Sequence, residues 1–492
     1  MNQVQEKSKT YAHFIGVGGA GMSALALVLL QRGLRVSGSD LKESRYTRML
    51  EAAGLELHIG HDAKQLGDPD VVVVSTAIPE SNPELREARL RNLPVWQRAQ
   101  MLAEITKDST AIAVAGTHGK TSTSSMLANT LEVLGLNPGF CIGGEVEAFS
   151  ANARDGAGQP FVVEADESDG SFVWLKPQLA IITNLEPEHV DHYESFDELI
   201  QVFETFVDRI YDDGVLIACG DDPELMELAK NSKKSLISYG CGTDCDIRYS
   251  KIVPFEGKPG SNFLISYQGE TYPASITLPG SHMVANATAV FAAAIQLGIN
   301  PKKAAEALGT FQGVRRRFEF LGQFDGVSIV DDYGHHPTEI EATLAGAKDL
   351  AYKRTIVVFQ PHRYTRTQAF EKEFGYAFDH ADLIILTDVF SGGEAPIPGI
   401  SGRTVVNSIL EHNSKAQVVW LPRKQSLSAF LCACTRPGDL LITMGAGDVT
   451  TVGPEFVREQ LERKNSNKSA LSEFVAATVD GTCVDPDDTH AG

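Results

Sequence analysis

The amino-acid sequence predicts an α/β protein in which helices cover parallel sheets. Short apolar runs alternate with helix-forming segments along most of the 492 residues, and this alternation is typical of parallel sheets. Several of these runs also end in glycine-rich turns or in groups of charged and aromatic side chains. With 43% hydrophobic residues the chain can bury more than one core, and its length favours two to four domains.

The first segment, residues 11–107, begins with a strand predicted over Ala12 to Gly16, followed by a glycine-rich turn and an apolar helix. Further strands are predicted at Leu34 to Gly38 and at Val71 to Ser75. The polar residues at the ends of these strands are Ser39, Asp40, Ser75 and Thr76. The apolar run Met22 to Leu30 is too short to cross a membrane, so we expect a buried helix there.

The turn in this segment, Gly16-Val-Gly-Gly-Ala-Gly21, matches the pattern G-x-G-x-x-G. Its glycines, Gly16, Gly18, Gly19 and Gly21, allow a pyrophosphate to approach the backbone and a helix N-terminus. Asp40 follows about 20 residues later, where an acidic residue binds a ribose in dinucleotide sites. NAD and UDP-sugars both contain a pyrophosphate and a ribose, so the pattern alone leaves both ligands open.

The second segment, residues 108–320, carries a phosphate loop. The buried strand predicted at Ala111 to Ala115 leads into a turn and then into a helix that reaches Leu134. The turn residues are Gly116, Thr117, His118, Gly119, Lys120, Thr121 and Ser122. Its backbone N–H groups, the helix start and the Lys120 ammonium favour a bound phosphate, and the Thr121 hydroxyl is placed for a magnesium ion. Val114 replaces the first glycine of the strict G-x-x-x-x-G-K-[ST] pattern, so the loop is a variant.

More strands in this segment end in polar residues. The runs 161–166, 179–184 and 215–218 are predicted strands, and residues 246–278 alternate as short antiparallel strands do before a helix at Met283 to Leu297. A carboxylate such as Glu164 or Asp166, beyond a phosphate loop, commonly reaches magnesium. His189 follows the next strand and is a candidate for contact with metal or phosphate. Arg317, in the run Arg315 to Arg317, is the candidate for stabilising charge on a transferring phosphoryl group.

The third segment, residues 321–463, repeats the α/β alternation. Its predicted strands are 327–330, 355–359, 383–387, 417–421 and 439–444. Two adjacent strand ends carry polar side chains, namely Asp331, Tyr333 and His335 at the first and His362 and Arg363 at the second. Open α/β sheets bind ligands at such an edge, which predicts a polar site here. Residues 464–492 are polar and we expect them to be disordered.

The charge balance limits the classes of partner. With 43 Lys and Arg against 64 Asp and Glu, the net charge is −21, which argues against a general nucleic-acid or anionic-membrane surface. We also expect no nucleic-acid partner and no membrane insertion. The seven cysteines are scattered and lack the spacing of a zinc site, as expected for reduced thiols in a cytoplasmic protein.

Taken together, the motifs of the chain resemble those of the Mur ligases. The resemblance extends from about His13 to Val452 and rests on the runs 13–23, 116–121, 163–168, 331–337, 360–366 and 444–448. It implies an N-terminal Rossmann-like domain for a UDP-sugar (1–107) and a central P-loop ATPase-type α/β domain with a small antiparallel β part (108–320). It also implies a C-terminal Rossmann-like domain that brings the amino acid and closes on ATP (321–463).

The resemblance also implies an activity, namely the ATP-dependent joining of L-alanine to the carboxylate of UDP-N-acetylmuramate through an acyl phosphate. It assigns Thr121, Glu164 and His189 to Mg²⁺ or Mn²⁺, and His282, Asn286 and Asp331 to ATP beside the phosphate loop. The first glycine loop and its neighbouring strand ends would hold the UDP-sugar. Tyr333, His335, His362 and Arg363 would act at the alanine end. Met283 stands where the family usually has an asparagine.

Other functions remain open from the sequence. A NAD-dependent dehydrogenase would use the first glycine turn but leave the Lys120 loop without a task, and a nucleotide-dependent switch would leave the third segment without one. A folylpolyglutamate synthase-like or muropeptide-recycling ligase on the same scaffold is a nearer alternative. A monomer and a homodimer are both compatible with the sequence.

Overall fold

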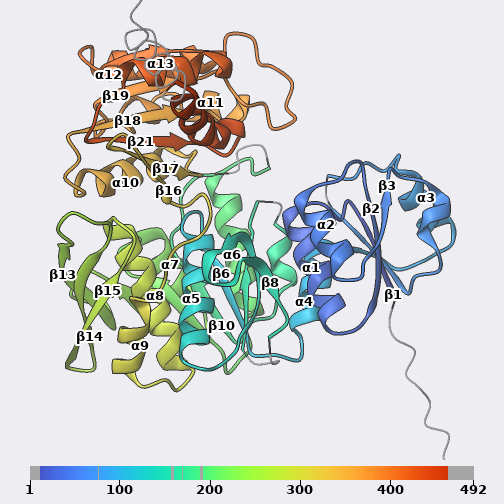
Figure 1. Ribbon diagram of the computed structural model, residues 1–492. Helices are drawn as coiled ribbons and strands as arrows, with labels where there is room; N and C mark the ends of the chain where they lie inside the picture. Colours follow the sequence, from blue (N-terminus) through green and yellow to red (C-terminus); the bar gives the residue numbers. More distant parts are fainter. Residues whose placement is uncertain (1–10, 76, 157–159, 169, 189–191, 464–492) are drawn as a thin grey trace, which may run out of the picture. The chain divides into compact units, whose positions relative to one another are not determined.

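The computed structural model describes residues 11–75, 77–156, 160–168, 170–188 and 192–463. The chain divides into two compact units (Figure 1). The first runs to Glu319 and also includes Ala342–Ala351, and the second comprises Phe320–Glu341 and the chain from Tyr352 onward. His189, Thr76 and the tail 464–492, for which the sequence predicted roles or disorder, lie outside the described residues.

The N-terminal part of the first unit contains a five-stranded parallel sheet with the strand order β3-β2-β1-β4-β5. The strands are β1 (Tyr11–Ile15), β2 (Arg35–Asp40), β3 (Glu56–Ile59), β4 (Val71–Val74) and β5 (Val95–Gln97). The helices are α1 (Ala20–Gln31), α2 (Arg45–Ala52), η1 (Ala63–Leu66), α3 (Pro83–Leu90) and α4 (Arg98–Thr106).

Successive side chains along these strands point to opposite faces of the sheet, which explains why helices cover both faces. Phe14 and Val73 face a core that includes residues of α1, α2 and α4, whereas Ile15 and Val74 pack with residues of α3 and η1. Successive side chains of a strand point to opposite faces, so both faces of a parallel sheet need cover. Residues 22–29 of α1 are buried, which confirms the expected buried helix.

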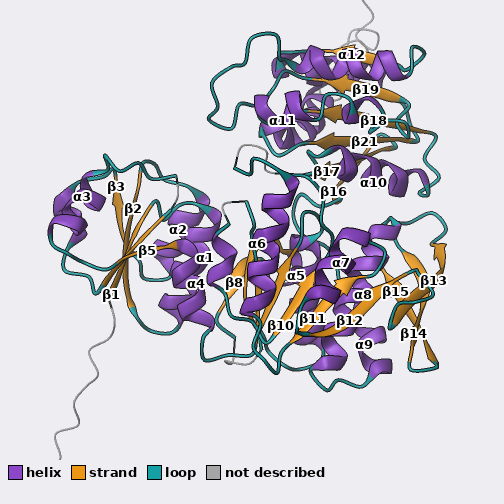
Figure 2. Cartoon of the chain, turned by 180° about the vertical axis from the view of Figure 1, so that it is seen from behind, coloured by secondary structure: helices purple, strands orange, loops and turns teal. Residues whose placement is uncertain are grey.

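The rest of the first unit is built on a ten-stranded sheet with the order β15-β14-β13-β12-β11-β10-β6-β9-β7-β8 (Figure 2). The strands are β6 (Ala111–Ala115), β7 (Gly139–Val146), β8 (Ala151–Arg154), β9 (Phe161–Glu164), β10 (Leu179–Ile182), β11 (Val215–Cys219), β12 (Ser235–Gly240), β13 (Ile247–Pro254), β14 (Ser261–Tyr267) and β15 (Glu270–Ile276). The helices are α5 (Lys120–Val133), η2 (Glu147–Phe149), η3 (Ser171–Trp174), α6 (Phe196–Arg209), α7 (Pro223–Asn231), α8 (Ser281–Gln296) and α9 (Pro301–Leu308).

Both ends of this sheet are antiparallel. The strands β13, β14 and β15 pair antiparallel, as the alternation predicted, and β13 joins them in parallel to β12, so they extend the central sheet. At the other end β7 and β8 form an antiparallel hairpin that also packs against α1 of the N-terminal part. Asn152 of β8 donates a hydrogen bond to the carbonyl of Ala20 at the start of α1 (3.0 Å).

The second unit contains a six-stranded sheet with the order β16-β17-β21-β18-β19-β20, parallel from β17 to β20. The strands are β16 (Glu319–Phe324), β17 (Val327–Asp332), β18 (Arg354–Phe359), β19 (Leu383–Leu386), β20 (Val418–Trp420) and β21 (Asp439–Met444). The helices are α10 (Pro337–Lys348), which belongs to the first unit from Ala342 onward, α11 (Tyr364–Ala369), η4 (Glu373–Gly375), α12 (Gly402–His412), η5 (Lys424–Ser426), α13 (Leu427–Cys434) and η6 (Asp448–Thr451).

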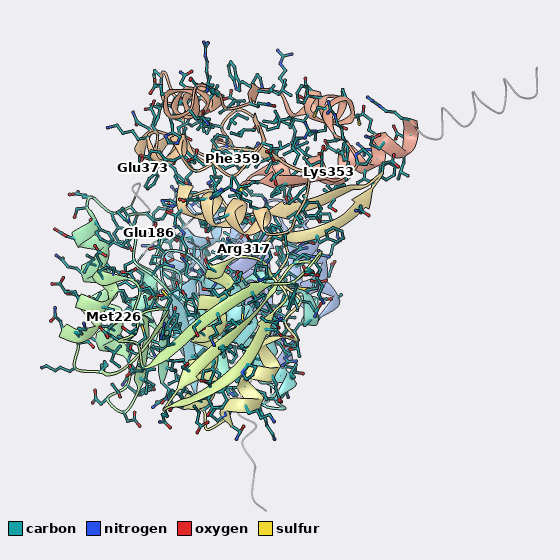
Figure 3. The ribbon with its side chains drawn as sticks, turned by 90° about the vertical axis from the view of Figure 1, so that its left-hand side faces the viewer. Glu186, Met226, Arg317, Lys353, Phe359 and Glu373 are labelled. Carbon is teal, nitrogen blue, oxygen red and sulfur yellow. The ribbon has the colours of Figure 1, made fainter. Side chains whose placement is uncertain are left out.

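The core of the second unit lies on both faces of β18. Phe359, labelled in Figure 3, is fully buried and packs against Phe374 and Phe378. Ile356 and Val358 point to the opposite face, into a cluster with Leu427 and Leu431 of α13. The predicted α/β class is therefore confirmed, whereas the exact domain boundaries remain a prediction.

Candidate active site

The phosphate loop connects β6 to α5 and depends on two glycines. Gly116 has φ +122° and Gly119, the N-cap of α5, has φ +83°, both in the region that favours glycine. A Cβ on Gly116 would lie 2.2 Å from Thr183 Oγ1, so no larger residue fits. Because Gly119 makes the turn, α5 begins at Lys120, two residues before the predicted start, and its first N–H groups face the loop.

Lys120 is held inside this loop. Its Nζ donates to the carbonyls of Gly116 (2.6 Å) and Thr117 (2.9 Å) and to Glu167 Oε1 (2.8 Å). Burial acts to lower the pKa of Lys120, but the charges of Glu167 and Asp166 outweigh it and raise that pKa. Lys120 is therefore protonated, as a phosphate-binding lysine must be.

Glu167 is a site residue that the sequence did not identify. Its side chain is fully buried, and Tyr193 donates a hydrogen bond to its backbone carbonyl. The acidic run Glu164-Ala-Asp-Glu167, in which it lies, is the sequence signal that could have identified it.

The oxygen atoms of Thr121 and Glu164 come together at the start of α5. The Thr121 hydroxyl donates to Glu164 Oε1 (2.8 Å), and the Gly143 N–H donates to Glu164 Oε2 (2.7 Å). Hydroxyl and carboxylate oxygens are the hard ligands that Mg²⁺ prefers. The donor set therefore fits the predicted metal.

Backbone from β7 packs closely against these residues. A Cβ on Gly143 would lie 2.9 Å from Glu164 Oε1, and one on Gly144 would lie 2.9 Å from Thr121 Cγ2. The two glycines thus allow the strand to approach both predicted metal ligands.

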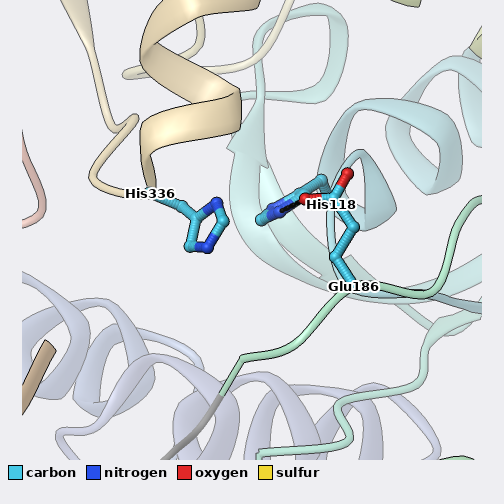
Figure 4. A group of neighbouring side chains, drawn as sticks. All are labelled: His118, Glu186 and His336. Atoms are coloured by element: carbon cyan, nitrogen blue, oxygen red, sulfur yellow. Dashed lines mark ion pairs between the residues drawn. The ribbon is translucent and has the colours of Figure 1, made fainter. Parts of the chain in front are cut away.

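His118 of the phosphate loop forms an ion pair of 3.5 Å with Glu186, which follows β10 (Figure 4). The His118 N–H donates to Asn184 Oδ1 (2.8 Å), and the Asn184 amide donates back to the His118 carbonyl (3.1 Å). Asn184, which follows β10, therefore fixes the loop.

Two of the residues predicted to bind ATP, His282 and Asn286, lie in the first two turns of α8. Asn286 lies beside the phosphate loop, because a Cβ on Gly119 would be 3.0 Å from Asn286 Oδ1. The Asn286 amide also approaches the Met283 sulfur (3.8 Å). His282 lies against Gly280, while Ser122 is buried in the first turn of α5.

The first glycine loop connects β1 to α1. The N–H groups of Gly16 and Val17 donate to the Ser39 carbonyl (2.9 and 3.0 Å), and the Gly18 N–H donates to Asp40 Oδ2 (2.8 Å). Asp40 thus holds the loop itself, a contact that the fingerprint did not predict. Gly19 caps α1 without a side-chain hydrogen bond, and Ser75 Oγ accepts a bond from the Ala77 N–H (3.3 Å).

A buried polar network supports the strand ends beside this loop. The fully buried Glu84 of α3 accepts hydrogen bonds from His13 Nε2 (2.7 Å), Ser39 Oγ (2.8 Å) and His61 Nδ1 (3.0 Å). Burial acts to raise the pKa of Glu84, but the hydrogen bonds from His13 and Ser39 outweigh it and lower that pKa. Ser39 is therefore fixed by an ionised carboxylate.

The arginine run follows a short bridge between Val146 and Val314. Arg315 forms an ion pair with Glu145 (3.3 Å), and Arg316 has φ +62°. Arg317, labelled in Figure 3, donates its N–H to the Val314 carbonyl (3.1 Å). The run is thus attached to β7 through its backbone and Glu145.

In the second unit, three of the predicted alanine-site side chains lie next to one another. The ring centroids of Tyr333 and His335 are 5.4 Å apart, and those of His335 and His362 are 5.6 Å apart. His362 also stacks on Phe390 (5.8 Å). Arg363 follows with φ +65° and caps α11.

Asp331 is held by hydrogen bonds from side chains of the second unit. Its carboxylate accepts hydrogen bonds from the hydroxyls of Thr443 (2.6 Å) and Thr450 (2.8 Å), and its side chain is buried. Its role toward ATP stays a prediction.

Two further properties concern the described part of the chain. None of its helices is long and apolar enough to cross a membrane. Its six cysteines are free thiols, and burial raises the pKa of Cys141 and of Cys219 to about 12.

Three family models match the chain in succession. They are the Mur ligase family catalytic domain (residues 11–110), the Mur ligase middle domain (114–294) and the Mur ligase glutamate ligase domain (316–447). Two curated relatives are the UDP-N-acetylmuramate–L-alanine ligases of Rubrobacter xylanophilus and Pelotomaculum thermopropionicum. The first is 46% identical over 90% of this chain and 99% of its own, and the second is 42% identical over 93% and 99%.

Solved structures agree with these matches. UDP-N-acetylmuramate-alanine ligase MurC from Thermotoga maritima has a TM-score of 0.76 and 27% identity, over 92% of this chain and 99% of that one. A murein peptide ligase from Psychrobacter arcticus has a TM-score of 0.68 and 26% identity, over 91% and 98%. The family models and these relatives therefore define a ligase with an α/β fold. The chain belongs to the Mur ligase family.

Proposed function

We propose that this protein joins L-alanine to the carboxylate of UDP-N-acetylmuramate at the expense of ATP, as a step of peptidoglycan synthesis. The observation that carries the proposal is the presence of two anion-binding glycine loops in one compact unit, each opening a helix. One loop suits the diphosphate of a UDP-sugar and the other a triphosphate. The curated relatives at 42–46% identity are named for this reaction.

The chemistry requires two transfers. The muramate carboxylate attacks the γ-phosphorus of ATP, which gives an acyl phosphate and ADP. The alanine amine then attacks the acyl carbon, and phosphate leaves the tetrahedral intermediate.

In the first transfer the protein must stabilise negative charge on the phosphoryl oxygens. The protonated Lys120, the N–H groups at the start of α5 and Arg317 would supply positive potential there. Thr121, Glu164 and His189 would hold Mg²⁺ or Mn²⁺, which when bound supplies further positive charge. His282, Asn286 and Asp331 would bind the nucleotide.

In the second transfer the amine must lose a proton while the alanine carboxylate is held. Arg363 is suited to pair with a carboxylate in bidentate fashion, and His362 or His335 to orient the amine or accept its proton. Tyr333 lies beside His335 and would complete this end of the site.

The Lys120 loop and the third family domain weigh against the dehydrogenase alternative, because a dehydrogenase would leave both without a task. We place the enzyme in the cytoplasm, with no nucleic-acid partner, as a monomer or homodimer.

Phosphate release from ATP tests the proposal. We expect release that requires both UDP-N-acetylmuramate and an amino acid, with L-alanine preferred over glycine, L-serine and D-glutamate. A murein peptide ligase shares the fold, so the panel also includes the tripeptide L-alanyl-γ-D-glutamyl-meso-diaminopimelate. Release with the tripeptide and not with L-alanine would contradict the proposed acceptor, and oxidation of NADH without phosphate release would contradict the ligase assignment.

A further inference from the structure

Arg98 opens α4 at the edge of the N-terminal sheet that carries the first glycine loop. It follows β5, and β5, β4 and β1 are parallel neighbours. Because the carboxyl ends of parallel strands meet at one edge, the start of α4 and the loop after β1 lie at the same edge. The sequence did not single out Arg98.

The Arg98 side chain lies directly against the first turn of α1. A Cβ on Gly21 would be 3.0 Å from Arg98 Cδ and 3.2 Å from its Nη1. A larger residue at Gly21 would therefore crowd the Arg98 side chain. The N-terminal turn of a helix and a guanidinium are both positive, so their proximity is favourable only with an anion between or beside them.

The Arg98 guanidinium also has few hydrogen-bond acceptors around it. Within the described parts of the chain it makes no hydrogen bond, and its ion-pair partner Asp166 Oδ2 lies 3.6 Å from Nη2, beyond hydrogen-bond distance. Its side chain is 29% exposed. Arginine has five N–H donors in a planar fork, and these are available to a ligand.

Asp166 relates this arginine to the phosphate loop. Asp166 follows Glu164 by two residues, and its Oδ2 is the ion-pair partner of Arg98 (3.6 Å). Arg98 therefore stands at the side of the first glycine loop that faces the phosphate loop.

We propose that Arg98 binds an oxyanion of the UDP-sugar substrate at the first turn of α1. The inference rests on the proposed function for the identity of that substrate. Two groups of UDP-N-acetylmuramate share the required chemistry, namely the diphosphate and the lactyl carboxylate. Both accept two parallel hydrogen bonds from a guanidinium, which a lysine cannot reproduce.

Calorimetry with three ligands tests the proposal. UDP, UDP-N-acetylglucosamine and UDP-N-acetylmuramate share the diphosphate, and only the last carries the carboxylate. For Arg98→Ala we expect UDP-N-acetylmuramate to bind about 10- to 100-fold more weakly, as for loss of charged hydrogen bonds. Arg98→Lys should recover only part of this. Equal losses for all three ligands would assign the diphosphate, and a loss confined to UDP-N-acetylmuramate would assign the carboxylate.

Arg89→Ala is the matched control. It removes the same charge from the N-terminal part of the chain, but Arg89 lies on α3, on the other face of the sheet, and pairs with Glu80 at an exposed position. Unchanged affinity of Arg98→Ala for all three ligands, or a loss no greater than that of the control, would overturn the proposal. So would an equal loss of affinity for a non-hydrolysable ATP analogue. Failure of the wild-type protein to bind UDP-N-acetylmuramate would instead contradict the proposed function, and thermal unfolding of both variants checks that each is folded.

Discussion

Lys120 Nζ lies 2.8 Å from Glu167 Oε1, and this ion pair occupies the interior of the phosphate loop. Glu167 is fully buried and the Lys120 side chain is only 13% exposed. An incoming phosphate therefore meets a lysine that already has a carboxylate partner. The pair links the stability of the loop to its affinity for the nucleotide.

Lys120→Ala should lower turnover by about 10²–10³-fold, as for loss of one preorganised charge-stabilising donor. It should also lower the free energy of unfolding by about 3 kcal/mol, because it leaves Glu167 buried without its cation. Steady-state phosphate release and urea unfolding measure the two effects, with the exposed Lys107→Ala as control. The double variant with Glu167→Gln should regain stability without regaining turnover, and recovery of both would refute the assignment.

Gly18→Val should weaken UDP-N-acetylmuramate binding by more than tenfold and leave ATP binding nearly unchanged. A Cβ at Gly18 would lie 2.8 Å from Asp40 Oδ2 and 3.0 Å from Thr47 Cγ2, so the branched side chain must displace the loop. Calorimetry with each ligand checks this. Gly33→Val is a useful control, since a Cβ there meets nothing within 4 Å, although its positive φ adds strain. Equal losses for both ligands would contradict two separate sites.

Removal of divalent cations should abolish turnover, and Glu164→Gln should raise the Mg²⁺ concentration needed for half-maximal rate. The neutral amide keeps the size of the carboxylate but is a much weaker ligand for a hard cation. Titration of activity with MgCl₂ after treatment with a chelator measures both. Full turnover in excess chelator would show that the metal assignment is wrong.

Glu84 should contribute to the acid sensitivity of the N-terminal sheet. Its pKa is lowered in the folded protein, so its contribution to stability is complete above its unfolded pKa of about 4.3 and is lost as the pH falls through the lower folded value. Glu84→Gln should therefore reduce stability at pH 7 and flatten its decline below about pH 4.3. Urea unfolding across this pH range tests it, and an unchanged slope would count against an ionised Glu84.

His362→Ala should raise the KM for L-alanine and leave the KM for ATP nearly unchanged. His362 is packed between His335 and Phe390, and its Nδ1 lies 3.1 Å from Arg366 Nη1. His412→Ala, on the exposed face of α12 near Asp379, is the control. Steady-state kinetics with each substrate varied in turn measure the two KM values. A rise in the KM for ATP alone would overturn the assignment of His362 to the alanine end.

The strand β6, which leads into the phosphate loop, and the strand β21 of the second unit were predictable because both are buried along their whole length. The bounds of β6 and β21 match the predicted residues, since continuous apolar runs ending in glycine are typical of buried parallel strands. The strand β7 was missed. It contains Gly143 and Gly144, which carry no side-chain pattern, and only the structure shows that they lie against Glu164 and Thr121.

Polar residues that act inside the fold were harder to predict. Glu84 follows Pro83 in the first turn of α3, where an acidic residue usually faces solvent, yet it is fully buried because His13 and Ser39 supply partners. Likewise, Arg98 and Glu167 can be recognised as site residues only through their contacts with segments that are distant in the sequence. The roles of the predicted site residues toward substrates stay predictions, because they depend on ligands.

The hairpin of β7 and β8 has a consequence for inhibitor design. It contacts α1 behind one glycine loop and Glu164 beside the other, and near Glu164 it presents main chain rather than side chains. Main-chain groups are the same in every variant, and a larger residue at Gly143 or Gly144 would collide with Glu164 or Thr121. A compound that makes its contacts with this main chain would leave few single substitutions that abolish its binding without also disturbing Glu164 or Thr121.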